Sequence, residues 1–241
     1  MDRSAYASLR AQEGTHWWFV ARRAILETLI SRRIAPRRDA HILEAGCGTG
    51  GNLAMLSRHG RVDALEYDGE ARGIAAARGI GRVEPGRLPD TIGFDGRCYD
   101  LIVLLDVLEH VEQDREALAA LRDRLAPGGR ILLTVPAAPW LWSEHDVLHH
   151  HKRRYTAASL HAVARDAGLQ VHEKGHFNAL LFPVAILVRA VQRLTGRGAA
   201  TEAAPPTSLN TLLRHVFATE RHLLGRVSLP FGLSLYAILT A

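Results

Sequence analysis

The sequence has little cysteine and little lysine, and it has no apolar run long enough to cross a lipid bilayer. Only two cysteines, Cys47 and Cys98, occur among 241 residues, which argues against a secreted disulfide scaffold and for a reducing compartment. The strongest apolar run, at 179–188, contains Pro183 and falls short of the roughly 20 residues that a spanning helix needs. Residues 1–12 are polar and lack the apolar region of a secretory signal. We therefore expect a cytoplasmic protein without a transmembrane helix.

The overall composition excludes several non-globular classes of protein. Hydrophobic residues make up 47% and charged residues 23% of the chain, which is ordinary globular usage. This balance excludes a disordered chain, a collagen-like fibre and a coiled-coil rod. The length allows one large domain or two small ones, at roughly 100–200 residues per domain.

The formal net charge of +5 raises the question of a nucleic-acid partner. Lys152 and Lys174 are the only lysines, and the arginines occur in scattered pairs, such as 22–23 and 153–154. Proteins that bind nucleic acids more often gather basic residues in one stripe with interleaved aromatic side chains. A nucleic-acid-binding or nucleic-acid-modifying protein is therefore kept as an alternative, and we expect no nucleic acid among the partners.

Strands and helices alternate along the first half of the chain. Apolar runs bounded by turn residues predict strands, and segments with helical spacing predict helices between them. This alternation is typical of an open, mostly parallel sheet with helices on both faces. The predicted strands lie at 41–45, 62–66, 101–105 and 130–135, and the predicted helices at 52–58, up to 78, and at 108–125.

The two ends of the chain differ from this central part. A helical N-terminal segment is predicted as a lid, and a helical insertion is predicted before the last strand. Within the insertion, helices at 178–195 and 209–225 flank a segment rich in glycine, alanine, proline and threonine at 196–208, which we expect to be mobile. We thus divide the chain into a lid at 1–38, a core at 39–176, an insertion at 177–227 and a final strand at 228–241.

A glycine-rich turn after the first predicted strand carries the most information about function. Gly46, Gly48 and Gly51 fit the G-x-G-x-x-G pattern of dinucleotide sites, which is weak evidence alone. Glu44, at the strand end, would sit poorly beside a pyrophosphate but suits a cationic ligand with an amino group and a sulfonium. Glu66, at the end of the second strand, stands where a carboxylate accepts from both hydroxyls of a ribose. The alternative is a tight strand–helix turn with Glu66 on the surface.

Four segments together resemble one known family. They are Glu-Ala-Gly-Cys-Gly-Thr-Gly at 44–50, Leu-Glu-Tyr-Asp at 65–68, the segment Asp-Leu-Ile-Val-Leu-Leu-Asp-Val-Leu-Glu-His-Val at 100–111, and Leu-Ala-Pro-Gly-Gly at 125–129. In order and spacing they resemble the motifs of class I S-adenosylmethionine-dependent methyltransferases. The resemblance implies a Rossmann-like, doubly wound, mostly parallel seven-stranded α/β sheet.

Further segments narrow this resemblance. His-Trp-Trp-Phe at 16–19 and the segments 140–146, 151–155 and 230–234 look like a bacterial small-molecule methyltransferase subgroup, with a type 11 or type 12 methyltransferase domain. Trp17 and its aromatic neighbours are more often core residues than ligand contacts. The acceptors of this subgroup are not well defined.

The resemblance also implies S-adenosylmethionine as the cofactor and a set of binding residues. The glycine turn would line the methionine end, Glu66 would hold the ribose and Tyr67 would lie against the adenine. The stretch 83–89 has no clear equivalent of the acidic residue with which many relatives bind the adenine amine. The predicted cofactor residues are Arg22, Glu44, Gly46, Cys47, Gly48, Gly50, Asn52, Glu66, Tyr67, Leu105 and Asp106.

Candidates for catalysis lie after the fifth strand, in the histidine-rich stretch 136–155. A hydroxyl or amine acceptor must lose a proton, and we predict His145 or His151 as the base, with Tyr155 as a further catalytic candidate. The alternative is that His151 and Arg153 only fasten this loop to the body. Histidine with a carboxylate also binds iron or zinc, but adjacent histidines rarely converge on one ion without a fixed scaffold, so we expect no metal.

The predicted function is the transfer of a methyl group from S-adenosylmethionine to an oxygen or nitrogen of a small organic molecule. That methyl acceptor is the expected partner of a monomer or homodimer. The apolar segment 178–195 also allows peripheral contact with a membrane. A membrane-peripheral methyltransferase of a lipid-linked substrate is therefore a second alternative.

Overall fold

The computed structural model describes residues 10–195, 205–224, 226–227 and 229–241. Parts of three predicted segments lie outside the described residues: 1–9 of the lid, 196–204 and 225 of the insertion, and 228 of the last strand. Most of the stretch predicted to be mobile, 196–208, also falls there.

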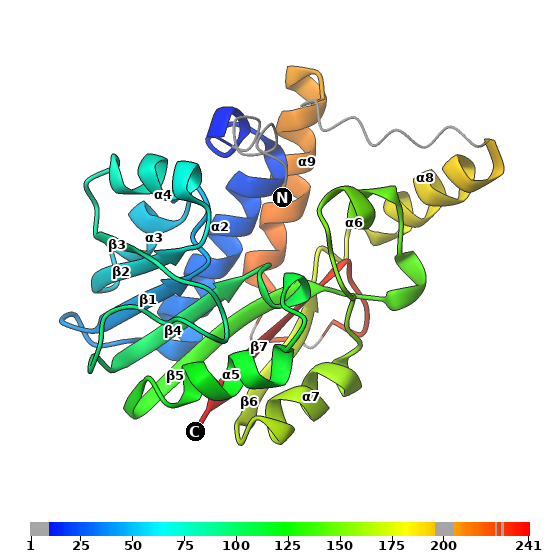
Figure 1. The fold of residues 1–241 in the computed structure, drawn as a ribbon. Helices are drawn as coiled ribbons and strands as arrows, with labels where there is room; N and C mark the ends of the chain where they lie inside the picture. Colours follow the sequence, from blue (N-terminus) through cyan, green and yellow to red (C-terminus); the bar gives the residue numbers. More distant parts are fainter. Residues whose placement is uncertain (1–9, 196–204, 225, 228) are drawn as a thin grey trace.

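A seven-stranded sheet forms the centre of the molecule (Figure 1). The order across it is β3-β2-β1-β4-β5-β7-β6, and β7 runs antiparallel to both of its neighbours while the other pairs are parallel. The mostly parallel, Rossmann-like α/β sheet predicted from the sequence is thus confirmed. Its strands are β1 His41–Ala45, β2 Arg61–Glu66, β3 Arg82–Pro85, β4 Tyr99–Leu105, β5 Leu125–Pro136, β6 Gln170–Phe177 and β7 Ser234–Thr240.

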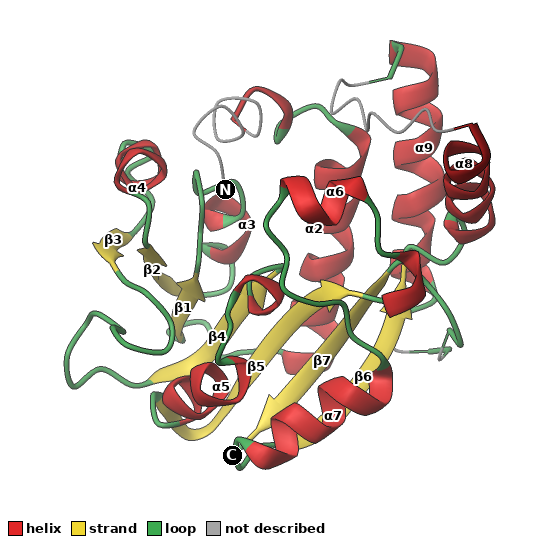
Figure 2. Ribbon diagram, turned by 45° about the vertical axis from the view of Figure 1, so that its right-hand side comes forward, coloured by secondary structure: helices red, strands yellow, loops and turns green. Residues whose placement is uncertain are grey.

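Helices cover both faces of the sheet, so its central strands are buried on both sides (Figure 2). In β4, Leu101 and Val103 pack into one apolar cluster, whereas Ile102 and Leu104 pack into the other. All four side chains are fully buried, because a strand alternates its side chains between two covered faces. The helices are α2 Trp17–Leu29, α3 Leu53–Leu56, α4 Gly69–Ala76 and α9 Thr207–Thr219 on the first face and α5 Asp114–Arg122 and α7 Ala157–Asp166 on the second.

Helix α2 belongs to the core. Its residues Ile25, Leu26 and Leu29 are fully buried, and the helix continues into a short π-helix, η1 Ile30–Ile34. These three side chains recur at the spacing of a helix that packs one face on a sheet, so the second half of α2, within the lid predicted at 1–38, packs into the core. The segment before α2 and the N-terminal half of α2, as far as Arg23, line the cavity described below.

One predicted helix, at 108–125, is interrupted. The structure has a 3-10 turn, η2 Leu108–His110, then an extended residue, Val111, and then α5. Asp114 and Glu116 lie in the first turn of α5, where acidic side chains stabilise the helix dipole, so the helix begins there. The interruption leaves the residues of η2 at the end of β4, beside the cavity.

The insertion lies between β6 and β7 and comprises α8 Phe182–Thr195, α9 and the 3-10 turn η4 Glu220–His222. Helix α9 lies along α2, where Asn210 Oδ1 accepts from the Trp17 amide at 2.8 Å and the ring of Phe217 contacts that of Trp17. Helix α8 projects from the body (Figure 1). None of the described helices combines the length and apolar character that crossing a membrane requires.

Candidate active site

A cavity of about 1470 Å³ opens at the carboxyl ends of the parallel strands. Open α/β sheets bind ligands at this edge, because the loops that follow the strands converge there. Its walls come from the loops after β1, β2, β3, β4 and β5, from the segment before α2 and from α8. Two further short elements follow β5 on the same side, η3 Pro139–Leu141 and α6 Glu144–Leu148. Most of the predicted cofactor residues line it, namely Arg22, Gly46, Cys47, Gly48, Asn52, Glu66, Tyr67, Leu105 and Asp106.

The glycine turn after β1 has a backbone conformation that explains its composition. Gly46 has φ of +82° and Gly50 φ of +80°, in the left-handed region that disfavours other residues. A Cβ on Gly46 would lie 2.7 Å from Val107 Cγ2, and one on Gly50 would lie 2.9 Å from Leu53 Cδ1. Gly50 is not among the residues that line the cavity. Its role is therefore to shape the turn, whereas Gly46 also lines the wall.

Glu44 lies behind this wall, and its side chain is buried. Its Oε1 accepts from Asn52 Nδ2 at 2.8 Å, while its Oε2 has no hydrogen-bond partner among the described residues. Burial raises the pKa of Glu44 to about 7, and the hydrogen bond from Asn52 and the charge of Arg22 oppose the rise. An orphaned carboxylate oxygen next to the turn fits the amino group of a cationic ligand.

Glu66, at the end of β2, faces the cavity from the other side of the turn. Its Oε2 accepts from the Gly48 amide at 2.7 Å and its Oε1 from the Asp68 amide at 2.9 Å. Each carboxylate oxygen has a further lone pair, so the same group can still accept from two ribose hydroxyls. Tyr67, which follows, is 69% exposed, with the Arg87 guanidinium 5.4 Å from the centre of its ring. These positions agree with a nucleoside held between β2 and β3.

A buried ion pair joins α2 to the ends of β4 and β5. Arg22 Nη2 lies 2.5 Å from Asp106 Oδ2 and donates to Thr134 Oγ1 at 3.0 Å. Thr134 Oγ1 in turn donates to Asp106 Oδ1 at 3.2 Å. The pairing orients Asp106, which has a φ of +59°, at the floor of the cavity beside Leu105. Both residues thus line the cavity at the end of β4.

Four histidine rings gather at the opposite wall, and two of them are the predicted bases. Both His145 and His151 line the cavity, and His151 Nδ1 is 2.9 Å from Asp146 Oδ1. The ring of His110 lies 4.8 Å from that of His151, and the ring of His149 lies 4.2 Å from that of His145. Burial, and then the neighbouring imidazoles, lower the pKa of His110 and of His145 to about 4, so both rings are neutral at neutral pH.

The prediction that Tyr155 is catalytic is wrong. Its side chain is 2% exposed, it does not line the cavity, and its hydroxyl donates to Asp114 Oδ2 at 2.8 Å. Burial raises its pKa above the ordinary value for tyrosine, which keeps the phenol protonated. The sequence placed Tyr155 in the same loop as the histidines, but the chain turns there and directs the ring into the core.

Two cavity residues were missed among the candidates, Glu109 and His110. Both belong to the motif at 100–111, which we used only to identify the fourth strand. Glu109 is 1% exposed, and burial, then the charge of Asp106, raise its pKa above the ordinary value. The sequence does carry a signal that could have identified them. Both residues come shortly after a buried parallel strand, so they lie at the same edge of the sheet as His145 and His151.

Comparison with known proteins identifies the family. Residues 16–174 match the family model described as a methyltransferase domain. A mitochondrial ubiquinone biosynthesis O-methyltransferase of Schizosaccharomyces pombe is 32% identical over 101 residues, which cover 39% of this chain and 36% of that protein. A trans-aconitate 2-methyltransferase of Streptomyces avermitilis is 30% identical over 186 residues, covering 73% of this chain and 64% of that protein. The chain thus matches less than two thirds of the length of either relative.

Solved structures agree on the fold. A methyltransferase determined in complex with the Haloferax volcanii Trm112 activator has a TM-score of 0.63 and covers 99% of this chain and 94% of its own. At 19% sequence identity, this likeness concerns the fold alone. The resemblance drawn from the four motifs is confirmed, and S-adenosylmethionine is the cofactor. Because the methyltransferase-domain match spans more than half of the chain and the fold is that of solved methyltransferases, this protein belongs to the class I S-adenosylmethionine-dependent methyltransferase family.

Proposed function

We propose that this protein transfers the methyl group of S-adenosylmethionine to an oxygen or nitrogen of a small organic molecule. The observation that carries the proposal is the pair of buried carboxylates on the two sides of a glycine turn, of which Glu66 lines the cavity and Glu44 lies behind its wall. The cavity also extends beyond the turn to the histidine-rich wall, which leaves space for an acceptor.

The chain's own residues divide the work of binding. Glu66 accepts from the ribose, Glu44 and Asn52 attract the methionine amine, and the exposed ring of Tyr67 covers the adenine. Gly86 and Leu88, which line the cavity after β3, complete the adenine side, where the sequence has no clear equivalent of the adenine-binding acidic residue of many relatives. The bound cofactor supplies an activated methyl group on sulfur.

Catalysis then depends on how the acceptor is aligned and deprotonated. His145 and His151 line the far wall and are the proposed groups for this task. Hydrogen bonding to Asp146 leaves Nε2 of His151 as its cavity-facing nitrogen. The segment before α2 and the first half of α2 restrict the access of water, since His16, Trp18 and Arg22 line the cavity.

The names of two relatives support an acceptor that is a small molecule. The Schizosaccharomyces pombe protein is named as an O-methyltransferase of ubiquinone biosynthesis, and the Streptomyces avermitilis protein as a methyltransferase of trans-aconitate. The narrower likeness to a type 11 or type 12 bacterial subgroup and the cytoplasmic location stay predictions.

Isothermal titration calorimetry with S-adenosylmethionine tests the first half of this proposal, with saturable binding expected. A screen of small metabolites, read out as formation of S-adenosylhomocysteine, tests the second half. Absence of binding at millimolar cofactor would contradict the proposal. Methylation of a nucleic acid or a protein, with no small molecule methylated, would contradict the proposal that the acceptor is a small molecule.

A second candidate function, the methylation of a lipid-linked acceptor at a membrane surface, is favoured by helix α8. It exposes apolar side chains, with Val184 55%, Leu187 65% and Leu194 86% exposed. The helix also contributes Val184 and Val188 to the cavity, so an apolar acceptor could reach the site along it. Liposome flotation is the test, and failure to float on anionic and neutral vesicles would remove this candidate.

A further inference from the structure

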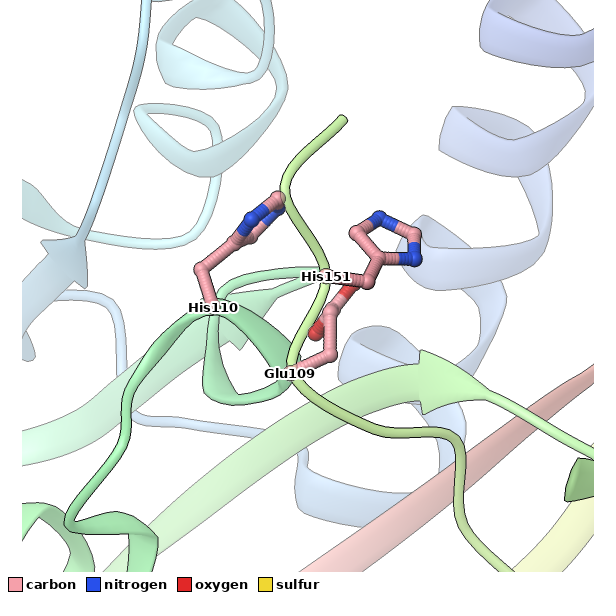
Figure 3. A group of neighbouring side chains, drawn as sticks. All are labelled: Glu109, His110 and His151. Atoms are coloured by element: carbon pink, nitrogen blue, oxygen red, sulfur yellow. The ribbon is translucent and has the colours of Figure 1, made fainter. Parts of the chain in front are cut away.

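Glu109, His110 and His151 form a compact group of side chains at the histidine-rich wall of the cavity. One carboxylate oxygen and one nitrogen of each ring lie within 4.8 Å of one another. Figure 3 shows that the three come from two segments, η2 and the loop that carries His151, and that in this view the carboxylate lies between the two rings. Segments far apart in the sequence thus present three metal-binding atoms to one point.

The carboxylate of Glu109 is an unusual group to bury at this place. It is 1% exposed, and its Oε2 has no hydrogen-bond partner among the described residues. Burying a carboxylate without partners is costly, and buried charges are normally paired or bound to a metal. Asp106, whose charge acts on Glu109, is itself paired with Arg22 and accepts a hydrogen bond from Thr134. Among the described residues, Glu109 forms no ion pair, and the charges of Arg22 and Arg154 act on it only from a longer range.

The surroundings of His151 are those of a metal-binding imidazole. Its Nδ1 bonds to Asp146 Oδ1 at 2.9 Å, and Arg154 Nε holds the same carboxylate oxygen at 2.7 Å. A histidine that ligates a metal through one nitrogen almost always donates the other to a carboxylate or carbonyl, which fixes its tautomer and ring orientation. Asp146 performs this function, and it is itself fully buried.

We propose that Glu109, His110 and His151 bind one divalent transition-metal ion, with zinc as the reference ion. Two imidazole nitrogens and one carboxylate are the ligand set of open zinc and iron sites, and magnesium and calcium prefer all-oxygen sets. Small rotations of the two rings bring the ligand atoms to the roughly 3 Å separation that zinc bonds require. The remaining coordination positions face the cavity, where water or an acceptor oxygen would complete them.

The position of this ion assigns it a role, and that role rests on the proposed function. An acceptor hydroxyl bound to the ion is polarised and loses its proton more readily, so the oxygen becomes a better nucleophile. The proton passes to a nearby base, for which His145 is available once His151 serves as a ligand. The ion therefore selects acceptors with an oxygen donor, such as an enol, a phenol or a carboxylate.

Metal binding is tested without cofactor or acceptor, on full-length protein freed of metal with a chelator. Titration with Co²⁺ should give the visible absorption bands of a low-symmetry site, and Zn²⁺ should displace Co²⁺ at about one ion per chain. Glu109→Gln and His110→Asn should each weaken Zn²⁺ binding by about 100-fold or more. Circular dichroism and thermal melting of both variants establish that they are folded.

The matched control is His150→Asn, because His150 stands beside His151, is exposed and has a φ of +55° that asparagine tolerates. Its Zn²⁺ affinity should equal that of the wild type. A loss as large as that of Glu109→Gln would show that the ion binds the surface histidine run, and absence of Co²⁺ bands would show no site; either result overturns the proposal.

A last measurement separates this inference from the proposed function. Chelation should leave the dissociation constant of S-adenosylmethionine unchanged but stop methylation of an acceptor found in the screen. Full methylation by the metal-free protein overturns the catalytic role of the ion. Failure to bind S-adenosylmethionine would contradict the proposed function, whereas the result of the metal titration would be unaffected.

Discussion

The two carboxylates beside the glycine turn differ in how far their surroundings satisfy them. Glu66 accepts two backbone amide hydrogen bonds, whereas Glu44 has one side-chain partner and an unpaired oxygen. A carboxylate with so few partners gains most from a cationic ligand. Binding of the cofactor should therefore depend on the protonation of Glu44 and on the hydrogen bonds of Glu66.

The first prediction concerns pH. In the unfolded chain the pKa of Glu44 lies near 4.5, and burial raises it to about 7 in the folded protein. Below about pH 7 the free protein must therefore lose this proton before the carboxylate can attract the ammonium group. Cofactor affinity should fall by up to about tenfold for each pH unit below that value.

Calorimetry in two buffers with different protonation enthalpies would detect the released proton. The control is Glu44→Gln, which cannot ionise and should bind more weakly but with little dependence on pH. An affinity that stays constant between pH 4.5 and about 7 in the wild type would refute this assignment.

A second prediction at the same scale concerns Glu66→Gln. The amide keeps one acceptor oxygen but removes the charge, and hydrogen bonds to charged groups contribute about 1.5–3 kcal/mol each. The dissociation constant of S-adenosylmethionine should rise by about tenfold to hundredfold. Glu70→Gln, an exposed change at the start of α4, should bind as the wild type does. Normal binding by Glu66→Gln would mean that the ribose lies elsewhere.

At the scale of elements, the loop after β5 is held by a set of buried polar contacts. Arg154 Nη1 donates to the Ala137 carbonyl at 2.9 Å, and Arg153 Nη1 lies 2.8 Å from Asp114 Oδ2. Tyr155 bonds to the same Asp114. These contacts fasten the histidine-bearing segment to α5 and β5, and Arg153 has the fastening role that the sequence alternative gave to it and to His151. The same loop nevertheless brings His145 and His151 to the cavity.

The third prediction follows from the purely structural role of Tyr155 in this loop. Tyr155→Phe should lower the free energy of unfolding by about 1 kcal/mol, because one hydrogen bond is lost while Asp114 keeps its pairing with Arg153. Cofactor affinity should not change. Urea unfolding and calorimetry measure the two quantities. If Tyr155→Phe keeps the stability of the wild type but no longer methylates an acceptor found in the metabolite screen, Tyr155 is a catalytic residue after all.

For the whole molecule, the insertion is joined to the sheet by one buried carboxylate. Glu220 accepts from the amides of Asn178, Ala179 and Leu180 at 2.6, 2.8 and 2.8 Å. It thereby ties the end of α9 to the chain just after β6. Asn178 lines the cavity, so this contact also positions part of its wall.

The fourth prediction tests this connection. Glu220→Gln places an amide group against at least one of the three backbone donors, and should destabilise the fold by about 1.5–3 kcal/mol in urea unfolding. Glu116→Gln, on the exposed side of α5, should leave the free energy of unfolding nearly unchanged. Equal effects of the two variants would show that the insertion is held by its apolar contacts alone.

A fifth prediction concerns the surface charge. Several arginines are paired on separate elements, as Arg33 is with Glu173 at 2.7 Å and Arg58 with Glu27 at 2.9 Å. Pairing of this kind leaves little of a continuous basic stripe. Binding to duplex DNA should therefore be weak at low salt and show a shallow salt dependence. A steep fall in affinity with added salt would restore the nucleic-acid alternative.

How much of this site the sequence could predict depends on the kind of signal. Glu44 and Glu66 lie at the ends of strands and Gly46 directly follows one, so local spacing is enough to predict their places in the chain. Tyr155 was misassigned and Glu109 was missed, because both assignments depend on the direction in which a side chain leaves the backbone. Direction at a chain turn is decided by packing against segments far along the chain.

The amino-acid sequence by itself determined the alternation of strands and helices, the glycine turn and the two carboxylates beside it, because these arise from periodicity and from local backbone preferences. Only the tertiary structure decided that α2 packs as a core helix and that Glu109 and His110 meet His151. The physical reason is that burial and convergence are properties of the assembled sheet. Residues 40 positions apart contact one another only when β4 and β5 lie side by side and end at the same edge.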